Sequence, residues 1–310
     1  MKSSSIKTEY SPEQVASFPA LAGEIAPGSL TQLTEGHFSQ AFKFETSQGE
    51  DRVLRLGRKL YSFEADQYAH DHFAAADVPI PRVYEIGEAE PGLYFCVSEF
   101  APGTPSDQMP PDEFAKARLD IERAFAAIFH KDISATTGEG DIDPKTGNGV
   151  NRSFAEALKA ERAKENLDEL RRQCEAAGIE SDLLTKFSNQ FEQNIDQVRY
   201  TRRLIHADLG SDNVIVKDNK VSAIIDWSGM GYGDWLHDYS RLEFWYPGRH
   251  TPAREFASQY GLETENFVER WLAHMAAHAL STIDFAFRYE SHHTQDWLRQ
   301  YLPSRLGKTA

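Results

Sequence analysis

The sequence predicts an α+β protein with a small antiparallel-sheet lobe that carries one helix, and a large, mainly helical lobe. Residues 40–46 and 52–56 alternate apolar and polar side chains around a turn at Gln48-Gly49, which is typical of a β-hairpin. Within 110–131 the apolar side chains instead recur every three or four residues, as on one face of a helix. Strands and helices do not alternate regularly along the chain, which disfavours a parallel βαβ fold.

The first lobe is expected to span residues 1–100. Its helix should begin at Ser62 as the N-cap and run to about residue 76, because the prolines of Val78-Pro79-Ile80-Pro81 cannot continue a helix. Two further strands are expected at 83–87 and 93–100, on either side of a Glu90-Pro91-Gly92 turn. A hinge follows at about 98–103.

The second lobe is expected to span 101–310 and to carry a single β-hairpin. The chain from Arg203 should run through a loop into a strand that ends at Val216, turn at Asp218-Asn219 and return along 221–225. Residues 137–151 are polar and rich in glycine, which indicates a loop. The helices expected in this lobe lie at 110–131, 152–176, 181–200 and through most of 234–302.

The charge balance restricts the partners. Thirty-three Lys and Arg face 48 Asp and Glu, giving a net charge of −15. Such a chain is repelled by nucleic acid and by anionic membranes, whereas it can attract a cationic ligand. No apolar run approaches the ~20 residues of a membrane helix, and the two cysteines lie too far apart to suggest a disulfide framework. We expect a cytoplasmic protein that is a monomer or a weak homodimer.

One segment carries most of the chemical information. Residues 204–216 hold His206, Asp208 and Asn213 in the pattern H-x-D-x-x-x-x-N, and Asp226 closes the next strand. Asn213 and Asp226 thus offer an amide oxygen and a carboxylate from adjacent strand ends, which are ligands that Mg²⁺ prefers. Asp208, on the loop before them, is placed to accept the proton of an attacking hydroxyl group. The pattern predicts phosphoryl transfer from a nucleotide.

Simpler interpretations exist for each of these residues. Asp and Asn are common turn formers, and an aspartate at a strand end often only caps or turns the chain. His206 is more typical of a residue that supports the loop through a backbone hydrogen bond than of a catalytic group. A metal hydrolase is disfavoured because no second histidine stands at ligand spacing near His206. The combined pattern favours phosphoryl transfer over an arrangement of turns.

At these residues the chain resembles the aminoglycoside phosphotransferases, which are relatives of the protein kinases. The resemblance extends from about Leu33 to about Tyr246 and is strongest in 206–213, 225–228 and 72–81. It implies a bilobal protein-kinase-like fold that binds ATP or GTP between its lobes. By position, Asp208 would be the catalytic base, and Asn213 and Asp226 would hold Mg²⁺. The hinge residues that would meet the base of the nucleotide are Ser98, Glu99, Phe100 and Ala101.

Two departures from the family pattern concern the phosphate site. Arg55 stands where the family usually has a lysine, and Asp66 stands where the following helix usually has a glutamate. An arginine keeps the positive charge and can grip phosphate with its planar fork, and the shorter aspartate suits its greater length. The alternative for Arg55 is a solvated charge on a strand. Gly36 and Ser39 lie in the first loop, where the resemblance implies backbone amides that face the phosphates; alone, this loop indicates an ordinary hairpin turn.

The acceptor implied by the resemblance is an aminoglycoside, with hygromycin B as the first candidate, and the implied role is antibiotic resistance. Because aminoglycosides are polycations, their site should present carboxylates. The segment after Asp226 supplies the candidates Asp234, Asp238, Glu243 and Trp245. Asp238 could equally tie this segment to the catalytic loop, and Trp245 could belong to the core. Two other functions stay open: a metabolic kinase for choline, homoserine, a sugar or a macrolide, and a nucleotide-binding protein without catalysis.

Overall fold

The computed structural model describes residues 9–21, 23–33 and 39–306. Packing groups the chain into two compact units. The first unit contains the chain up to Ala124 together with Asp212–Gly229, and the second contains Phe125–Ser211 and the chain from Met230 onward. The expected division into lobes near residue 100 stays a prediction, because this grouping follows packing rather than the position of a hinge.

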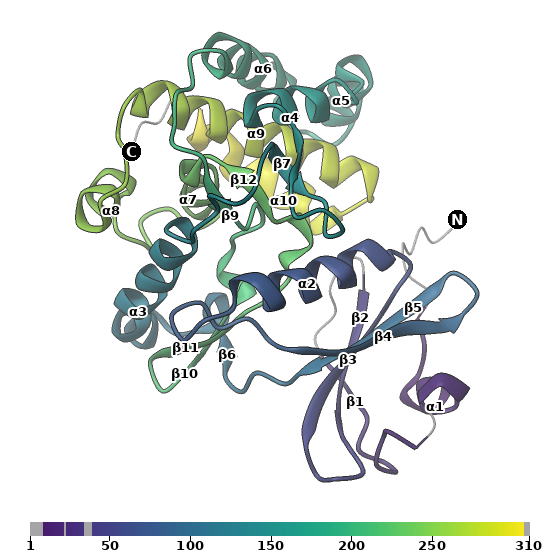
Figure 1. Ribbon diagram of the computed structural model, residues 1–310. Helices are drawn as coiled ribbons and strands as arrows, with labels where there is room; N and C mark the ends of the chain where they lie inside the picture. The colour runs from purple at the N-terminus through teal and green to yellow at the C-terminus, as the bar shows by residue number, and fades with distance from the viewer. Residues whose placement is uncertain (1–8, 22, 34–38, 307–310) are drawn as a thin grey trace. The chain divides into compact units, whose positions relative to one another are not determined.

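The first unit is built on an antiparallel sheet with the strand order β1-β2-β3-β5-β4 (Figure 1). Both predicted hairpins are present, with Phe42 opposite Leu54 in one and Ile86 opposite Cys96 in the other. Side chains of β2 alternate between buried and half-buried positions, as the period of a strand requires. The strands are β1 (Thr31–Gln32), β2 (Ser39–Glu45), β3 (Asp51–Gly57), β4 (Val83–Glu90) and β5 (Leu93–Glu99).

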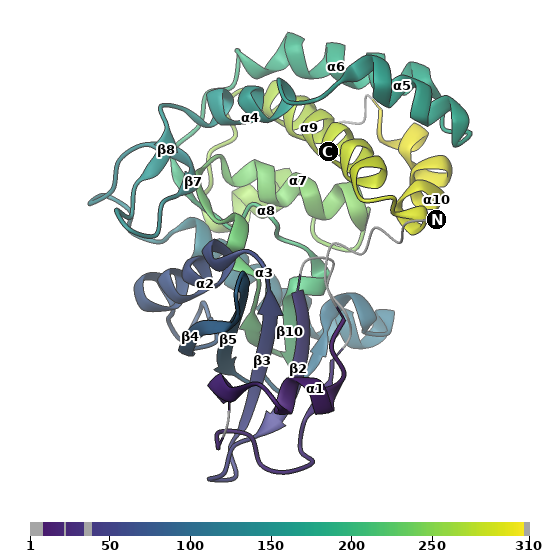
Figure 2. The same cartoon turned by 90° about the vertical axis from the view of Figure 1, so that its right-hand side faces the viewer.

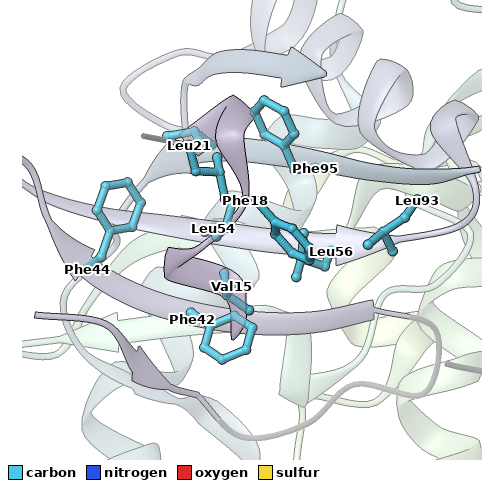
Figure 3. Close-up of a cluster of buried hydrophobic side chains, with 10 residues drawn as sticks. Val15, Phe18, Leu21, Phe42, Phe44, Leu54, Leu56, Leu93 and Phe95 are labelled. Carbon is cyan, nitrogen blue, oxygen red and sulfur yellow. The ribbon is translucent and has the colours of Figure 1, made fainter. Parts of the chain in front are cut away.

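A short helix, α1 (Pro12–Ala16), and a 3₁₀ turn, η1 (Pro19–Leu21), cover one face of this sheet. Figure 3 shows their side chains Val15, Phe18 and Leu21 against the apolar residues of the strands. The amide of Gln40 fixes the approach of this segment, since it accepts the N–H of Tyr10 at 3.0 Å and donates to the carbonyl oxygen of Tyr10 at 2.8 Å. The hydrophobic pattern of the first thirty residues did not reveal this layer, because its apolar residues are few and irregularly spaced.

The other face of the sheet carries α2 (Leu60–Phe73), whose Phe63 packs on Val83 and Cys96. The predicted N-cap, Ser62, is wrong, because the helix begins at Leu60 after an extended Lys59. The physical reason is the short connection: β3 runs to Gly57, so two residues alone link strand and helix. The helix also ends at Phe73, a few residues before the predicted end at about 76.

The rest of the first unit is a three-stranded sheet in the order β11-β10-β6. Asp218 and Asn219 both have positive φ angles, 51° and 60°, and form the tight turn between β10 and β11 that the sequence predicts. Gly103, with φ of 139°, lies so close to β10 that a Cβ atom would overlap the carbonyl oxygen of Val216. The elements are β6 (Thr104–Pro105), η2 (Ser106–Gln108), the first part of α3 (Pro111–Phe129), the last two residues of η3 (Ser211–Asn213), β10 (Val214–Lys217), β11 (Lys220–Ile224) and η4 (Trp227–Gly229).

The second unit contains a four-stranded sheet in the order β8-β7-β12-β9, and this corrects the prediction of a loop over 137–151 and of a single hairpin after residue 101. The glycines that indicated a loop instead allow strands to approach closely. Gly140 has a φ of 72°, and a Cβ atom on Gly231 would overlap the carbonyl oxygen of Gly140 on the neighbouring strand. The strands are β7 (Glu139–Ile142), β8 (Gly149–Asn151), β9 (Arg203–Ile205) and β12 (Gly231–Gly233).

Helices form the remainder of the second unit, and α9 packs against both α6 and α7 (Figure 2). The single helix predicted at 152–176 is two helices, because Asn166 caps a new start by accepting the N–H of Glu169 at 3.1 Å. Within the described residues, no helix combines the length and the apolar character that crossing a membrane requires. The helices are α4 (Phe154–Arg162), α5 (Leu167–Ala176), α6 (Ser181–Ile195), α7 (Trp235–Trp245), α8 (Ala253–Tyr260), α9 (Phe267–Arg288), α10 (His292–Tyr301) and the 3₁₀ turn η5 (Leu302–Arg305).

Candidate active site

A cavity of about 510 Å³ lies within the first unit. Apolar side chains such as Ala41, Val53 and Ile215 form its walls, and polar groups gather at a few positions. This composition is typical of a small-molecule site. The predicted nucleotide and metal residues that line it are Ser39, Arg55, Asp66, Ser98, Glu99, Phe100, Ala101, Asn213 and Asp226. Gly36 lies outside the described residues.

The end of β5 borders the cavity and is fixed on one side by the chain before β4. The N–H of Glu99 donates to the carbonyl oxygen of Arg82 at 2.8 Å, and the carboxylate of Glu99 accepts the N–H of Arg82 at 3.2 Å. Lys43 Nζ stands 4.4 Å from the centre of the Phe100 ring. The Glu99 side chain is therefore engaged by the N–H of Arg82. That backbone groups of this stretch meet a nucleotide base stays a prediction.

Arg55 and Asp66 form an ion pair at the cavity. Arg55 Nη2 lies 2.5 Å from Asp66 Oδ2, with 20% and 8% of the two side chains exposed. Burial disfavours the charge of Arg55, but the carboxylate of Asp66 outweighs burial and raises the pKa of the guanidinium group. The arrangement does not fit the alternative of a solvated strand charge. It provides a permanently charged group at the wall of a cavity, as phosphate binding requires.

Asp66 has a second task that the sequence did not indicate. Its other oxygen, Oδ1, accepts the N–H of Trp227 at 2.8 Å. Trp227 is fully buried and directly follows Asp226, which adopts a left-handed backbone with φ of 61°. Non-glycine residues seldom adopt this conformation, and it persists only where the surroundings enforce it. Asp66 therefore helps to fix the backbone that aims Asp226.

Asn213 and Asp226 lie at adjacent strand ends of the β10–β11 hairpin. The N–H of Ile225 donates to the carbonyl oxygen of Asn213 at 2.9 Å, which brings the two segments side by side. Asn213 is 8% exposed. Asp226 is exposed, and its Oδ1 accepts the hydroxyl of Ser228 at 2.9 Å. An amide oxygen and a carboxylate that face one cavity suit Mg²⁺, which takes oxygen ligands and keeps several positions for water or phosphate.

The loop with the predicted base lies in the second unit. Asp238, on α7, is fully buried and its carboxylate accepts the N–H of His206 at 2.7 Å and the N–H of Ala207 at 2.8 Å. Burial raises the pKa of Asp238 to about 6. Of the two interpretations of Asp238, this geometry favours the one that ties the segment after Asp226 to the catalytic loop. His206 is itself fully buried. That Asp208 is the catalytic base stays a prediction.

Sequence reasoning missed Arg241. Its guanidinium group, one quarter exposed, forms an ion pair with the carboxylate of Asp208. Arg241 stands three positions after Asp238 on α7, so both side chains lie on the same face of the helix. The i, i+3 spacing of Asp and Arg was visible in the sequence, but the packing of α7 on the 206–208 loop was not.

The remaining predicted substrate residues fall into two groups. Asp234 does not fit the prediction, because it is fully buried: it caps α7 by accepting the N–H of Leu236, and its carboxylate is held by Arg270 and His274. Burial alone would raise the pKa of Asp234, but these two partners outweigh it and lower the pKa well below its ordinary value. An acid with no exposed surface in the folded chain cannot contact a substrate.

Glu243 and Trp245 keep partial access to solvent. Glu243 is half-buried, and burial raises the pKa of its carboxyl group. Trp245 is also half-buried, and its ring lies 4.3 Å from that of Trp297 and meets Phe244 edge-on. Trp245 therefore belongs to an aromatic cluster while part of it stays exposed, so a contact with substrate stays a prediction.

The strand order, the ion pair between α2 and β3, and the hairpin with Asn213 and Asp226 at its ends are typical of a kinase-like α+β phosphotransferase fold. Comparison with known proteins agrees: residues 29–280 match the phosphotransferase enzyme family, and the chain belongs to that family. Over 224 residues it is 31% identical to hygromycin-B 4-O-kinase of Escherichia coli. That match covers 70% of this chain and 62% of the kinase, so the chain spans less than two thirds of that relative.

Solved structures give the same picture. The chain is similar to a thermostable mutant of aminoglycoside phosphotransferase APH(4)-Ia in ternary complex with AMP-PNP and hygromycin B, with a TM-score of 0.75 and 26% identity. The match covers 90% of this chain and 93% of that one. It also resembles the GDP and kanamycin complex of APH(2")-IIIa, with a TM-score of 0.63 over 94% of this chain and 96% of that chain. At 14% identity, the second likeness shows the fold alone.

Proposed function

We propose that this protein transfers the γ-phosphoryl group of ATP to a hydroxyl group of an aminoglycoside, with hygromycin B as the first acceptor to test. The observation that carries this proposal is the cavity of the first unit, where Arg55, Asp66, Asn213 and Asp226 meet beside the end of β5. Charged groups at the wall of a cavity are unfavourable for binding a purely apolar ligand, because they would lose water without gaining a polar partner. The relatives named for hygromycin B support the choice of acceptor.

In this proposal the base of the nucleotide lies between apolar side chains of β2, β3 and β10 and meets backbone groups of 99–101. Arg55 contacts the phosphates, and Asp66 keeps the guanidinium group in place. ATP is the first nucleotide to test because the similar APH(4)-Ia structure holds AMP-PNP, an ATP analogue. GTP is the second.

Asn213 and Asp226 would hold Mg²⁺, which when bound neutralises the charge of the phosphates. Asp208 accepts the proton of the acceptor hydroxyl group while the oxygen of that hydroxyl forms the new bond to the γ-phosphorus. The bond from the γ-phosphorus to the β–γ bridging oxygen breaks at the same time. The rate then depends on how the chain holds these groups rather than on covalent chemistry by the protein. Glu243 and Trp245 are the acceptor-binding residues of the proposal, without Asp234 and Asp238.

The direct test measures ADP release by the purified protein with a panel of acceptors. Hygromycin B, kanamycin and streptomycin represent the proposal, and choline, homoserine, a sugar and a macrolide represent other kinases. Phosphorylation of a member of the second group alone would replace the acceptor class and keep the chemistry. ATP binding with no product from any acceptor would indicate a nucleotide-binding protein without catalysis.

The role of the base is tested by Asp208→Asn. We expect turnover to fall by about 10²-fold or more, while the Kd for ATP stays unchanged. Asp218→Asn is the matched control: it removes the same charge from a turn residue with φ of 51°, a backbone that asparagine adopts readily. Full turnover in the Asp208→Asn variant would show that another group accepts the proton.

Antibiotic resistance is the proposed role in the cell. Expression in a sensitive bacterium should permit growth on hygromycin B, and the Asp208→Asn variant should not. Growth on kanamycin or streptomycin instead would assign a different aminoglycoside. We also propose a monomer or weak homodimer, which light scattering would show as the mass of one or two chains.

A further inference from the structure

The loop that carries Asp208 is held by one face of α7. Asp238 accepts the N–H groups of the two residues before Asp208, at 2.7 and 2.8 Å, and Arg241 pairs with the carboxylate of Asp208 itself. Three consecutive residues of the loop are thus fixed by two side chains that stand one helical turn apart. All three contacts lie within the second unit.

The backbone at this point needs such support. Ala207 has a φ of 62°, a left-handed conformation that is unfavourable for alanine because of its Cβ atom. This conformation sets the direction in which the next residue, Asp208, leaves the chain. Asp238 fixes the backbone on the near side of Asp208 through the N–H groups of His206 and Ala207. The carboxylate of Asp208 itself is held by the ion pair with Arg241.

From this geometry we infer that Arg241 is a positioning residue for the catalytic base, an inference that rests on the proposed function. The planar guanidinium group of an arginine fixes a carboxylate in direction as well as in distance, which a lysine does less well. A base that accepts a proton from a bound hydroxyl must lie within hydrogen-bond reach, and a displacement of about 1 Å can cost 10²-fold in rate.

The ionisable groups near Arg241 favour its interaction with the loop that carries Asp208. On its own helix it lies within electrostatic reach of Asp238 and His237, and on α9 within reach of His278. Burial lowers the pKa of both histidines well below the ordinary value, and the charge of Arg241 acts in the same direction. Those two rings are therefore neutral at pH 7, whereas Arg241 pairs with the carboxylate of Asp208 and lies within electrostatic reach of Asp238.

The test compares Arg241→Ala and Arg241→Lys with the wild type, using ATP and the acceptor identified above. We expect kcat to fall about 10- to 10²-fold in Arg241→Ala and less in Arg241→Lys. The KM for ATP should stay unchanged, because the nucleotide cavity belongs to the first unit. Addition of guanidinium ion at low millimolar concentration should restore part of the kcat of Arg241→Ala, since the ion can occupy the place of the missing side chain.

Arg172→Ala is the matched control, because Arg172 forms an exposed ion pair with Glu169 on α5 and its loss should leave kcat unchanged. Thermal denaturation of each variant separates positioning from stability. A kcat of Arg241→Ala within about twofold of the wild type would overturn the inference. A lower kcat with a lower Tm and no response to guanidinium would also overturn it. A wild type that phosphorylates no acceptor would overturn the proposed function instead, and the inference with it.

Discussion

Replacement of Asp66 should separate its two tasks. Asp66→Ala removes the ion pair with Arg55 and leaves the N–H of the buried Trp227 without its acceptor. An unsatisfied buried N–H costs about 1–3 kcal/mol, and the loss of one partner from a buried ion pair about 3–5 kcal/mol. The two costs add to about 4–8 kcal/mol, but solvent screens part of the ion pair because 20% of the Arg55 side chain is exposed, so we expect a smaller loss, about 3–5 kcal/mol of the free energy of unfolding.

Asp66→Asn should cost less, about 1.5–3 kcal/mol, because the amide oxygen can still accept the N–H of Trp227 while the charge opposite Arg55 is lost. Urea denaturation followed by circular dichroism measures both values. Asp51→Ala is the control on the same sheet: its exposed pair with Lys43 should contribute only about 0–1 kcal/mol. The Kd for ATP should rise in both Asp66 variants, since Arg55 loses its fixed direction.

A double-mutant cycle with Arg55→Met tests the reasoning further. If the ion pair is real, Asp66→Ala should cost less when Arg55 is already replaced, and the remaining cost should equal that of the Trp227 bond. The reasoning is refuted if Asp66→Ala destabilises no more than Asp51→Ala. It is also refuted if Asp66→Asn and Asp66→Ala have equal effects and neither depends on Arg55.

Four other perturbations have defined outcomes. Burial raises the pKa of Glu165 to about 7, so the folded chain holds this proton more tightly than the unfolded chain does. Relative to Glu165→Gln, the wild type should therefore lose about 2–3 kcal/mol of unfolding free energy between pH 5 and 8, which urea denaturation at a series of pH values measures. The buried His278 has a lowered pKa, so the unfolded chain binds its proton first; relative to His278→Gln, wild-type stability should fall below about pH 6.5, by at most ~1.4 kcal/mol per pH unit. Arg270→Met leaves the buried Asp234 without its arginine and should lower the unfolding free energy in urea by about 3–5 kcal/mol. Gly103→Ala should weaken ATP binding in calorimetry, because the added Cβ would push the cavity wall at Gly103 away from β10.

The strands and the chemical motif could be predicted from patterns of residues that are close together in the sequence. The alternation of Phe42 and Phe44 identified β2, and the Asp218-Asn219 pair identified the turn of the β10–β11 hairpin. Asn213 and Asp226 could be placed together because a tight hairpin brings its two ends side by side. These features depend on residues close in sequence, so the sequence was sufficient to predict them.

Features that depend on distant segments were missed or misread. Residues 137–151 contain a hairpin because β7 pairs with β12 about ninety residues later, and glycines serve the close approach of these strands. Asp234 suggested a substrate contact because it follows the metal segment, but Arg270 and His274 on α9 enclose it. No local pattern shows which helix will cover a carboxylate, because burial is a property of the packed chain.

The two loops that carry the predicted chemistry are held in the same way. Asp226 and Ala207, next to Asp208, both adopt left-handed backbone conformations, with φ of 61° and 62°. In each loop a buried aspartate accepts an N–H at the strained point: Asp66 accepts from Trp227, and Asp238 from Ala207. Asp66 pairs with one arginine, Arg55, and Asp238 stands one turn from another, Arg241. Phosphoryl transfer depends on position more than on reactive side chains, so residues that only hold the loops should affect turnover as strongly as some that touch the substrate. In the proposed function the family motif supplies the acids that act, and Asp66, Asp238 and Arg241 hold the loops that carry them.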